Sequence, residues 1–379
     1  MSAHLTIGIC GAGIGGLSAL IALNRVGLDA EIFEQTSAFA RVGADINLTP
    51  NAVRALDGLG VGDELRKTAA RPQFRISRMW NTGEETSRLA MSEAAEEKFG
   101  APQLTMHRAD LMSALVSRVP EGSLQMGKRV ENIEFSAGAK SSLAFTDGTS
   151  TSVDLLIGAD GIHSAVRKAM FGADHPTFTG VVAFRAVIPT EKLAGSADLD
   201  CFTKWWGPDP ETQIVMFPLN KGRDMFVFAT CPQDEWLEES WTTPGSSAEL
   251  RDLYRDFHPE AQAILAACDE VLKSALYVRD PLESWINGVA ALLGDACHPM
   301  MPFMAQGAGQ AIEDAVVLAR CLDGVSDIPS GLRAYQEARL ERTAQIQRGS
   351  RSNQWLKAGG NADWVYGYDA WDVPIGLSV

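Results

Sequence analysis

The chain has 379 residues, 46% hydrophobic and 21% charged, a composition typical of globular proteins and a length that suggests two or three lobes. Its formal net charge of −15 argues against a nucleic-acid partner or an anionic membrane surface, because both require basic patches. There is no apolar run of about 18 residues, no secretory signal and no C-x-x-C pair among the six cysteines, so we expect a cytoplasmic protein with reduced thiols.

The first segment, residues 4–35, predicts a buried strand, a glycine turn, a helix and a second strand. Gly11, Gly13 and Gly16 form G-x-G-x-x-G at the end of the first strand. The first glycine allows a tight turn, the second lets the backbone approach a pyrophosphate, and the third packs the helix on the strand. Glu34 ends the second strand, where a carboxylate binds both adenosine ribose hydroxyls and disfavours a 2′-phosphate. The segment therefore predicts a site for FAD or NAD.

The next segments offer weaker signals. Residues 41–48 are rich in turn formers, residues 51–59 form a predicted helix, and residues 106–119 form an amphipathic helix that begins near Arg108. A solvated arginine and a functional one are equally compatible with that position. Residues 154–170 repeat the strand, glycine turn and helix pattern, but they lack a full glycine fingerprint and a ribose-binding acid. A second dinucleotide site is therefore not predicted.

The middle of the chain, residues 176–270, differs in character. Its alternating and aromatic runs are separated by Gly, Pro and Asn, which is typical of antiparallel strands with one covered face. After Gly331 a long helical stretch follows, with arginine and glutamate on its outer face.

A third strand-to-helix transition covers residues 289–322. Asp295 stands at the strand edge and could accept a hydrogen bond from a ribityl hydroxyl, and Gly307 and Gly309 lead into the next helix. The N-terminus of that helix would stabilise the negative charge of a reduced flavin ring. His298 lies in the connecting loop, where a structural role is more common for a lone histidine than a catalytic one.

Together, residues 11–16, 158–161 and 294–298 resemble the motifs of single-component flavin-dependent aromatic hydroxylases, over essentially the whole chain. The resemblance implies an α/β fold with a Rossmann-like three-layer FAD-binding domain, a mainly antiparallel β substrate domain and C-terminal helices. The expected FAD-binding domain comprises residues 1–72, 100–175 and 271–330. Residues 73–99 and 176–270 are expected to form the substrate domain, and residues 331–379 the C-terminal helical segment.

The same resemblance implies one FAD held across the molecule, without a separate nicotinamide domain. The first motif takes the pyrophosphate, Glu34 and Gln35 the ribose, Arg108 the phosphates, and the backbone of Val130 the adenine. Asp295 contacts the ribityl chain, and the amides of residues 307–308 lie beneath the ring. The full set of expected cofactor-binding residues is Gly11, Gly13, Gly15, Gly16, Glu34, Gln35, Arg41, Arg108, Val130, Asp160, Asp295, Gly307 and Ala308.

In this family NADH or NADPH reduces FAD, and O₂ then forms a flavin C4a-hydroperoxide that hydroxylates an electron-rich aromatic ring without a metal. The sequences KWW and WVYGYD resemble a branch that acts on pyridine-ring acids such as 6-hydroxynicotinate with loss of CO₂. The small aromatic substrate is the only partner that we expect. Salicylate-type hydroxylation, epoxidation and a catalytically inactive flavin-binding regulator remain as alternatives.

The predicted substrate pocket contains Asn47, Arg185, Trp205, Thr212, Met216 and Phe303, with Asn47 and Met216 nearest the chemistry. The similar branch has histidines at the positions of Asn47 and Phe303 and a tyrosine near Met216. Since asparagine is not a general base at neutral pH, we expect the substrate to bind as an anion or water to take its proton. Arg185 is expected either to pair with a substrate carboxylate or to form a structural salt bridge.

Overall fold

The computed structural model describes residues 5–39, 45–136, 140–236, 243–351 and 361–376. A six-stranded sheet with the order β17-β18-β11-β1-β2-β7 organises the first domain. All neighbouring strands are parallel except the edge pair β17 and β18. The bounds are β1 (Ile7–Cys10), β2 (Ala30–Glu34), β7 (Leu124–Met126), β11 (Leu155–Gly158), β17 (Ile286–Asn287) and β18 (Ala290–Leu292).

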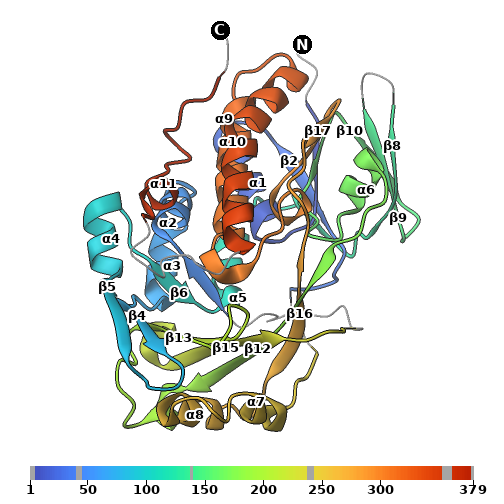
Figure 1. Ribbon diagram of the computed structural model, residues 1–379. Coiled ribbons are helices and arrows are strands. Elements are labelled where there is room, and N and C mark those ends of the chain that lie inside the picture. The colour runs from blue at the N-terminus through green and yellow to red at the C-terminus, as the bar shows by residue number, and fades with distance from the viewer. Residues whose placement is uncertain (1–4, 40–44, 137–139, 237–242, 352–360, 377–379) are drawn as a thin grey trace.

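This parallel sheet is the middle of three layers. On one side α1 packs against α5 and α9, and α10 packs on α9 (Figure 1). On the other side lies a three-stranded antiparallel sheet, where Phe145 contacts Phe33 of β2 at a ring separation of 5.0 Å. The bounds are α1 (Ile14–Arg25), α5 (Arg108–Val116), α6 (Ala165–Phe171), α9 (Gly307–Leu322), α10 (Ile328–Arg351), β8 (Val130–Phe135), β9 (Ser141–Phe145) and β10 (Ser150–Val153).

A seven-stranded sheet with the order β16-β12-β15-β14-β13-β4-β5 forms the second domain. All neighbours are antiparallel except β13 and β4. Helices α7 and α8 cover its outer face, and its inner face looks toward the first domain (Figure 1). The bounds are β4 (Phe74–Met79), β5 (Glu85–Ala90), β12 (Thr177–Pro189), β13 (Phe202–Trp206), β14 (Gln213–Leu219), β15 (Asp224–Pro232), β16 (Leu272–Val278), α7 (Ser247–Leu253) and α8 (Pro259–Ala266).

Shorter elements join the two domains. Strands β3 and β6 pair with each other, and the Thr105 hydroxyl of β6 donates to the Pro218 carbonyl of β14 at 2.6 Å. The bounds are β3 (Ile46–Leu48), β6 (Leu104–Met106), α2 (Pro50–Gly58), α3 (Gly62–Thr68), α4 (Ser92–Phe99), α11 (Asp363–Tyr366) and the short 3₁₀ helices η1 (Thr190–Leu193), η2 (Asn220–Gly222), η3 (Gly294–Ala296) and η4 (Pro302–Met304).

The three-layer α/β fold and the antiparallel second sheet agree with the sequence prediction. One boundary needs correction. Residues 272–278 were expected in the FAD-binding domain, yet they form β16 and pair with β12 in the second sheet. The chain therefore returns to the first domain only after Val278, and α10 begins at Ile328, before the predicted limit of 331.

All six cysteines are buried free thiols, as expected. Across the described residues, no helix combines the length and the apolar character needed to cross a bilayer.

Candidate active site

The glycine turn after β1 combines close packing with one open face. A Cβ at Gly16 would lie 1.9 Å from the Gly11 carbonyl oxygen, and Gly11 itself has a φ of +96°. The contact of α1 with β1 therefore requires a glycine at position 16, whereas position 11 favours glycine because of its left-handed backbone and its contact with the Ala159 carbonyl. A Cβ at Gly13 would meet no heavy atom within 4 Å. Gly13 thus leaves its face of the turn open, as the approach of a pyrophosphate requires.

The first cavity has a volume of about 460 Å³ and lies at this turn. The Glu34 carboxylate accepts the amides of Ala12 and Thr36, both at 2.9 Å, which fixes it at the cavity wall. The Asp160 carboxylate accepts the amides of Ala165 and Val166 at the start of α6. The predicted cofactor residues that line this cavity are Gly11, Gly13, Glu34, Gln35, Val130 and Asp160.

The second cavity, of about 340 Å³, adjoins the first, since Gly13, Ala159 and Gly161 line both. Of the predicted cofactor residues, it is lined by Gly13, Gly15, Arg108, Asp295, Gly307 and Ala308. Arg108 lines this cavity and the third one but not the first. Arg41, also predicted to bind the cofactor, lies outside the described residues.

The loop before α9 shapes the far end of the second cavity. Ala305 has a φ of +53°, a left-handed conformation that costs a non-glycine residue about 1 kcal/mol. Gly307 then begins the 16-residue helix α9, whose N-terminus carries a partial positive charge toward the cavity. Burial raises the pKa of Asp295, and the nearby His298 and Arg108 oppose that rise.

The third cavity, of about 270 Å³, lies between the seven-stranded sheet and this loop. It adjoins the second cavity, because Asp45, Asn47, Arg108, Pro302 and Ala305 line both. Its apolar wall contains a cluster of rings, with Phe202 stacked on Phe217 at 5.2 Å. The phenylalanines of this wall are Phe202, Phe217, Phe226, Phe228 and Phe303.

Four cations and one carboxylate complete the wall of the third cavity among the described residues: Arg75, Arg108, Arg185, Lys204 and Asp45. Arg185 donates to the Ser274 hydroxyl and lies 5.3 Å from the Phe228 ring centroid. Burial lowers the pKa of Arg185 to about 10, so the guanidinium stays protonated at neutral pH. Lys204 is buried, with Nζ 3.5 Å from the centroid of the Trp206 ring. The cavity therefore favours an anion that carries an aromatic ring.

Asp45, which sequence reasoning missed, lies where the second and third cavities meet. Burial raises its pKa to about 6, although the charges of Arg185, Arg108 and His107 act in the opposite direction. A single acidic residue in a turn-rich segment carries no motif that would mark it. Two positions on, Asn47 lines both cavities, and its side-chain oxygen accepts a 2.6 Å hydrogen bond from Gln103.

Three predicted pocket residues lie elsewhere, which corrects the sequence prediction. Trp205 and Met216 are buried on the outer face of the sheet, beneath α7 and α8. Side chains alternate along a strand, so their neighbours Lys204 and Val215 face the third cavity instead. Thr212 lies in the turn between β13 and β14, where its amide and hydroxyl both donate to Asp209. Met216 is therefore not positioned for catalysis.

A fourth cavity, of about 370 Å³, lies beside the third and extends toward α4 and α11. Asn47, Arg75, Phe202, Phe303 and Ala305 line both cavities. Phe303 is thus at the boundary between two cavities as well as in the wall of the predicted substrate pocket.

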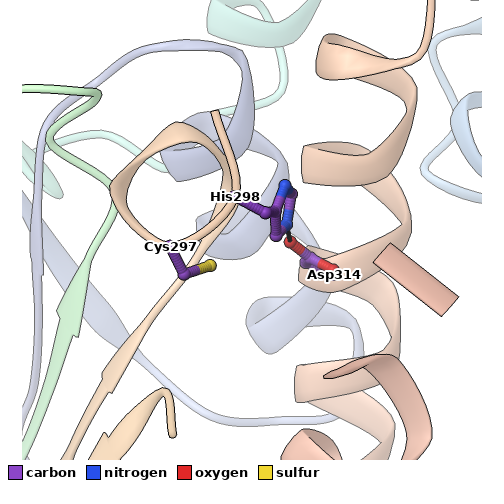
Figure 2. Close-up of side chains that lie close together, drawn as sticks. All are labelled: Cys297, His298 and Asp314. Carbon is purple, nitrogen blue, oxygen red and sulfur yellow. Dashed lines mark hydrogen bonds and ion pairs between the residues drawn. The ribbon is translucent and has the colours of Figure 1, made fainter. Parts of the chain in front are cut away.

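Cys297, His298 and Asp314 offer ligand atoms within 4.8 Å of one another, although the resemblance implies chemistry without a metal (Figure 2). Each of them has another partner. His298 Nε2 lies 2.6 Å from Asp314 Oδ2, and the Cys297 thiol donates to the Gly294 carbonyl at 3.3 Å. Burial raises the pKa of the Cys297 thiol well above its ordinary value, which disfavours the thiolate that a metal would bind. The group therefore fits a hydrogen-bond network that anchors the loop to α9.

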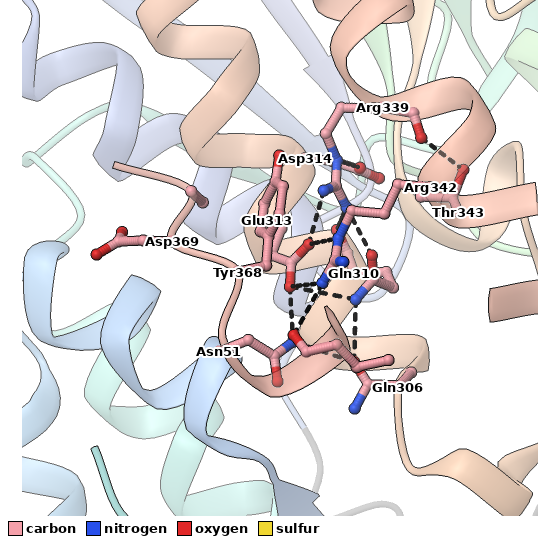
Figure 3. Close-up of polar contacts among 12 residues, drawn as sticks. Asn51, Gln306, Gln310, Glu313, Asp314, Arg339, Arg342, Thr343, Tyr368 and Asp369 are labelled. Atoms are coloured by element: carbon pink, nitrogen blue, oxygen red, sulfur yellow. Dashed lines mark hydrogen bonds and ion pairs between the residues drawn. The ribbon is translucent and has the colours of Figure 1, made fainter. Parts of the chain in front are cut away.

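Behind this loop lies a buried ionic network centred on Arg339 of α10 (Figure 3). Its guanidinium donates to Glu313 at 2.6 Å and to Asp314 at 2.7 Å, and all three side chains are fully buried. Burial alone would raise the pKa of Glu313, but the charges of Arg342 and Arg339 hold it below its ordinary value. The charges of His298 and Arg339 likewise hold the pKa of Asp314 below its ordinary value against the effect of burial, so both carboxylates are ionised and depend on the cations beside them.

The network reaches the second cavity through amide side chains. Asn51 at the start of α2 donates to Glu313 at 2.6 Å and to Gln306 at 3.0 Å. Gln306 in turn donates to the Thr49 hydroxyl at 2.8 Å and lines the second cavity. These contacts fix α2, α9 and α10 relative to the loop of residues 294–308.

Comparison with known proteins agrees with this site. The FAD binding domain family matches residues 4–350. The 6-hydroxynicotinate 3-monooxygenase of Bordetella bronchiseptica is 38% identical over 372 residues, which are 97% of this chain and 96% of that protein. The chain belongs to the FAD-dependent aromatic hydroxylases. The salicylate hydroxylase of Pseudomonas putida is 34% identical over 369 residues, covering 91% of this chain and 83% of that hydroxylase.

A solved structure also matches. The crystal structure of Klebsiella pneumoniae HpxO complexed with FAD and uric acid has a TM-score of 0.83 and 30% identity, covering 93% of this chain and 88% of that one. The resemblance inferred from the three glycine motifs is thereby confirmed. The chain is a flavin-dependent aromatic-ring monooxygenase with FAD as its cofactor, and NAD(P)H and O₂ are the typical co-substrates of this class.

The cavities of this hydroxylase fit FAD. The first and second cavities are contiguous, and the open face of Gly13 lies where they meet. Glu34 in the first cavity suits a ribose, and the N-terminus of α9 in the second suits the electron-rich edge of a flavin ring. The third cavity then adjoins the ring end, where a substrate would meet the cofactor.

Proposed function

We propose that this hydroxylase uses NAD(P)H and O₂ to hydroxylate a small aromatic or pyridine-ring acid, with a 6-hydroxynicotinate-like compound as the favoured substrate. The observation that carries the proposal is the third cavity, an aromatic enclosure with four cations at the ring end of the FAD cleft. Its volume of about 270 Å³ lies below the roughly 300–1,000 Å³ of sites for drug-sized ligands, which favours a monocyclic acid.

In the proposed reaction, FAD reduced by NAD(P)H supplies the activated oxygen. The chain's own residues bind and orient the ring. Arg185 and Lys204 hold the substrate carboxylate, and Phe217 and Phe228 pack against its ring and keep water out. A substrate whose carboxylate lies on the attacked carbon would lose CO₂ when the ring regains aromaticity. The names of the 6-hydroxynicotinate relatives support a pyridine-ring acid.

A substrate screen tests the proposal. The FAD-loaded enzyme is mixed with 6-hydroxynicotinate, 2-hydroxybenzoate and 4-hydroxybenzoate, each paired with its uncharged carboxamide. NADH and NADPH oxidation and O₂ uptake are followed, and products are identified by mass. We expect at least one acid to stimulate oxidation and gain one oxygen, with or without loss of CO₂, while its carboxamide does so at least about tenfold less well. Slow oxidation that no aromatic acid stimulates would instead support the inactive flavin-binding regulator.

A further inference from the structure

Among the described residues that line the third cavity, one side chain is able to accept a proton at neutral pH. Among the described residues that line it, Asp45 is the sole carboxylate, and the other ionisable side chains are arginines and a lysine. Arginine is permanently protonated and cannot act as a base, and amide side chains such as Asn47 do not accept protons at neutral pH. Asp295 lines the second cavity but not the third.

Asp45 also has the right position. It lines both the second and the third cavity, so it lies at the junction where the flavin ring and the substrate ring would meet. We propose that Asp45 is the catalytic base that accepts the proton of the substrate's ring hydroxyl. This inference rests on the proposed function. It gives Asp45 the role of proton acceptor, whereas the sequence had led us to expect that water takes the proton or that the substrate binds already ionised.

Charged groups from several elements act on Asp45, as Arg185, Arg108 and His107 do, or line one of its two cavities. Arg108 and His107 lie at the start of α5, Arg185 on β12, Arg75 on β4 and Lys204 on β13, and Asp295 of η3 borders the same second cavity. Burial favours the neutral carboxyl, whereas the nearby cations favour the carboxylate, and the result is a pKa of about 6. A group that titrates here is ionised at neutral pH and can still hold a proton in the closed site.

The proton-transfer step balances without any change of oxidation state. The O–H bond of the substrate breaks, its electron pair stays on the ring oxygen, and the proton forms a new O–H bond with a carboxylate oxygen of Asp45. The ring oxygen becomes anionic, and its electrons raise the electron density of the ring carbons ortho and para to it. Once the attacked carbon has gained oxygen and has lost its proton to solvent, or its carboxylate as CO₂, the aromatic ring is restored with an anionic ring oxygen, and Asp45 returns the proton to that oxygen. The carboxylate is thereby regenerated.

The positions of the charged groups also define how the substrate would be oriented in the cavity. Four cations can hold one carboxylate of the substrate, and Asp45 meets a hydroxyl on the side that faces the cofactor. A ring amino group can activate the ring through its lone pair without losing a proton first. Turnover of aromatic acids with a ring hydroxyl therefore depends on Asp45. Turnover of the corresponding acids with a ring amino group in place of the hydroxyl does not.

The test compares matched substrates in the FAD-loaded D45N enzyme. We expect kcat at pH 7 for a hydroxy acid to fall about 10²- to 10⁴-fold, which is the usual contribution of general base catalysis. Turnover of the amino analogue should stay within about threefold of wild type. The acidic limb of the kcat profile near pH 6 should disappear for the hydroxy acid and persist in D45E, which retains a carboxyl group.

Asp224 provides a matched control. It is another carboxylate in this region and pairs with His107 at 3.1 Å, but it does not line the third cavity. D224N should leave the ratio of hydroxy-acid to amino-acid turnover unchanged. Equal losses for both substrates in D45N would show that Asp45 only positions the ring, and an unchanged limb near pH 6 would show that another group accepts the proton. Either result overturns the inference.

A measurement on the wild-type enzyme covers the case in which D45N does not bind FAD. An ionised ring hydroxyl absorbs at longer wavelength than a neutral one, so anaerobic spectra of the bound hydroxy acid report its protonation. We expect an ionised fraction above pH 6, well below the pKa of the free substrate. A bound hydroxyl that stays neutral at pH 8 would overturn the role of Asp45. If no aromatic acid stimulates the wild-type enzyme at all, the proposed function itself fails.

Discussion

The cofactor cleft and the substrate cavity meet at Asp45 and Ala305, but they are built differently. The cleft is formed largely by the path of the backbone, at glycines such as Gly13 and at the N-terminus of α9. The substrate cavity is formed largely by side chains on six strands of the second sheet and on the loop before α9. Substrate preference can therefore change through single side chains while the cofactor site remains intact.

Both regions rest on the same buried ionic network. Gln306, which lines the second cavity, is connected through Asn51 and Glu313 to Arg339. Met304, which lines the fourth cavity between Phe303 and Ala305 of the third, packs on Ile346 of the same helix as Arg339. Disruption of this network should therefore impair the cofactor cleft and the substrate cavity together.

Arg339→Met is expected to have the largest effect. The substitution keeps an unbranched side chain but leaves the buried carboxylates of Glu313 and Asp314 short of one positive charge. Loss of one partner in a buried ion pair costs about 3–5 kcal/mol. Urea denaturation should show a decrease of that size in the free energy of unfolding, together with weaker binding of both FAD and substrate.

Arg66→Met is the matched control, because Arg66 pairs with Asp57 on the surface, where both side chains remain about one-third exposed. Exposed pairs of this kind contribute at most about 1 kcal/mol. Equal losses of stability in the two variants would contradict the central role of the Arg339 network.

Two alanine substitutions in the glycine turn sharpen the contrast between packing and binding. Gly16→Ala places a Cβ 1.9 Å from the Gly11 carbonyl and should destabilise the FAD-free protein by about 2–3 kcal/mol. Gly13→Ala meets no protein atom within 4 Å, so the FAD-free stability should change by less than about 1 kcal/mol.

The same Gly13→Ala variant should bind FAD at least about tenfold more weakly, because its methyl group occupies the open face of the turn. Titration with FAD, followed by flavin fluorescence, measures this change. Normal affinity in Gly13→Ala would indicate that the pyrophosphate does not approach this glycine.

Lys204 and Trp205 are adjacent on β13 and point to opposite faces of the second sheet, so substitutions there test the two faces independently. Lys204→Met removes a cation from the cavity wall and should raise KM for acid substrates about 10- to 100-fold, or about 1.4–2.8 kcal/mol, with little change in kcat. Trp205→Phe should lower stability by about 1–2 kcal/mol and leave KM unchanged, because Trp205 is buried beneath α7 and α8. Steady-state kinetics and thermal unfolding distinguish these outcomes, and a raised KM in the Trp205 variant alone would contradict the assigned strand faces.

This contrast also explains how much the sequence could predict. The fold and the cofactor cleft could be predicted from the glycine spacing and the order of strands and helices. Each glycine is required by a local feature of the backbone, such as a tight turn or a close contact between a helix and a strand. The substrate cavity depends on which strand face is turned inward. The aromatic runs identified β13 and β14 as strands, but both faces are buried, so Trp205 could not be distinguished from Lys204 by hydrophobicity. Asp45 was missed because its neighbours Arg108 and Arg185 are distant in the chain.

The last of these effects is the pH dependence that Asp45 gives to stability. Burial raises the pKa of Asp45 from the ordinary 3.8 to about 6, so the unfolded chain loses this proton at lower pH than the folded one. The stability that comes from the protonated group is complete below about pH 4 and is lost as the pH rises through 6. Asp45→Asn removes this loss, and its stability relative to wild type should increase by about 1–2 kcal/mol between pH 4 and pH 7.5.

Urea denaturation of the FAD-free proteins at several pH values between 4 and 7.5 measures this difference. A constant offset between variant and wild type would mean that Asp45 titrates at its ordinary pKa. The junction of the two cavities would then hold a permanently ionised carboxylate with little capacity to retain a proton. An increase across this pH range would mean that the folded chain is destabilised by an ionised group at this junction, as is common where a site is built for chemistry rather than for stability.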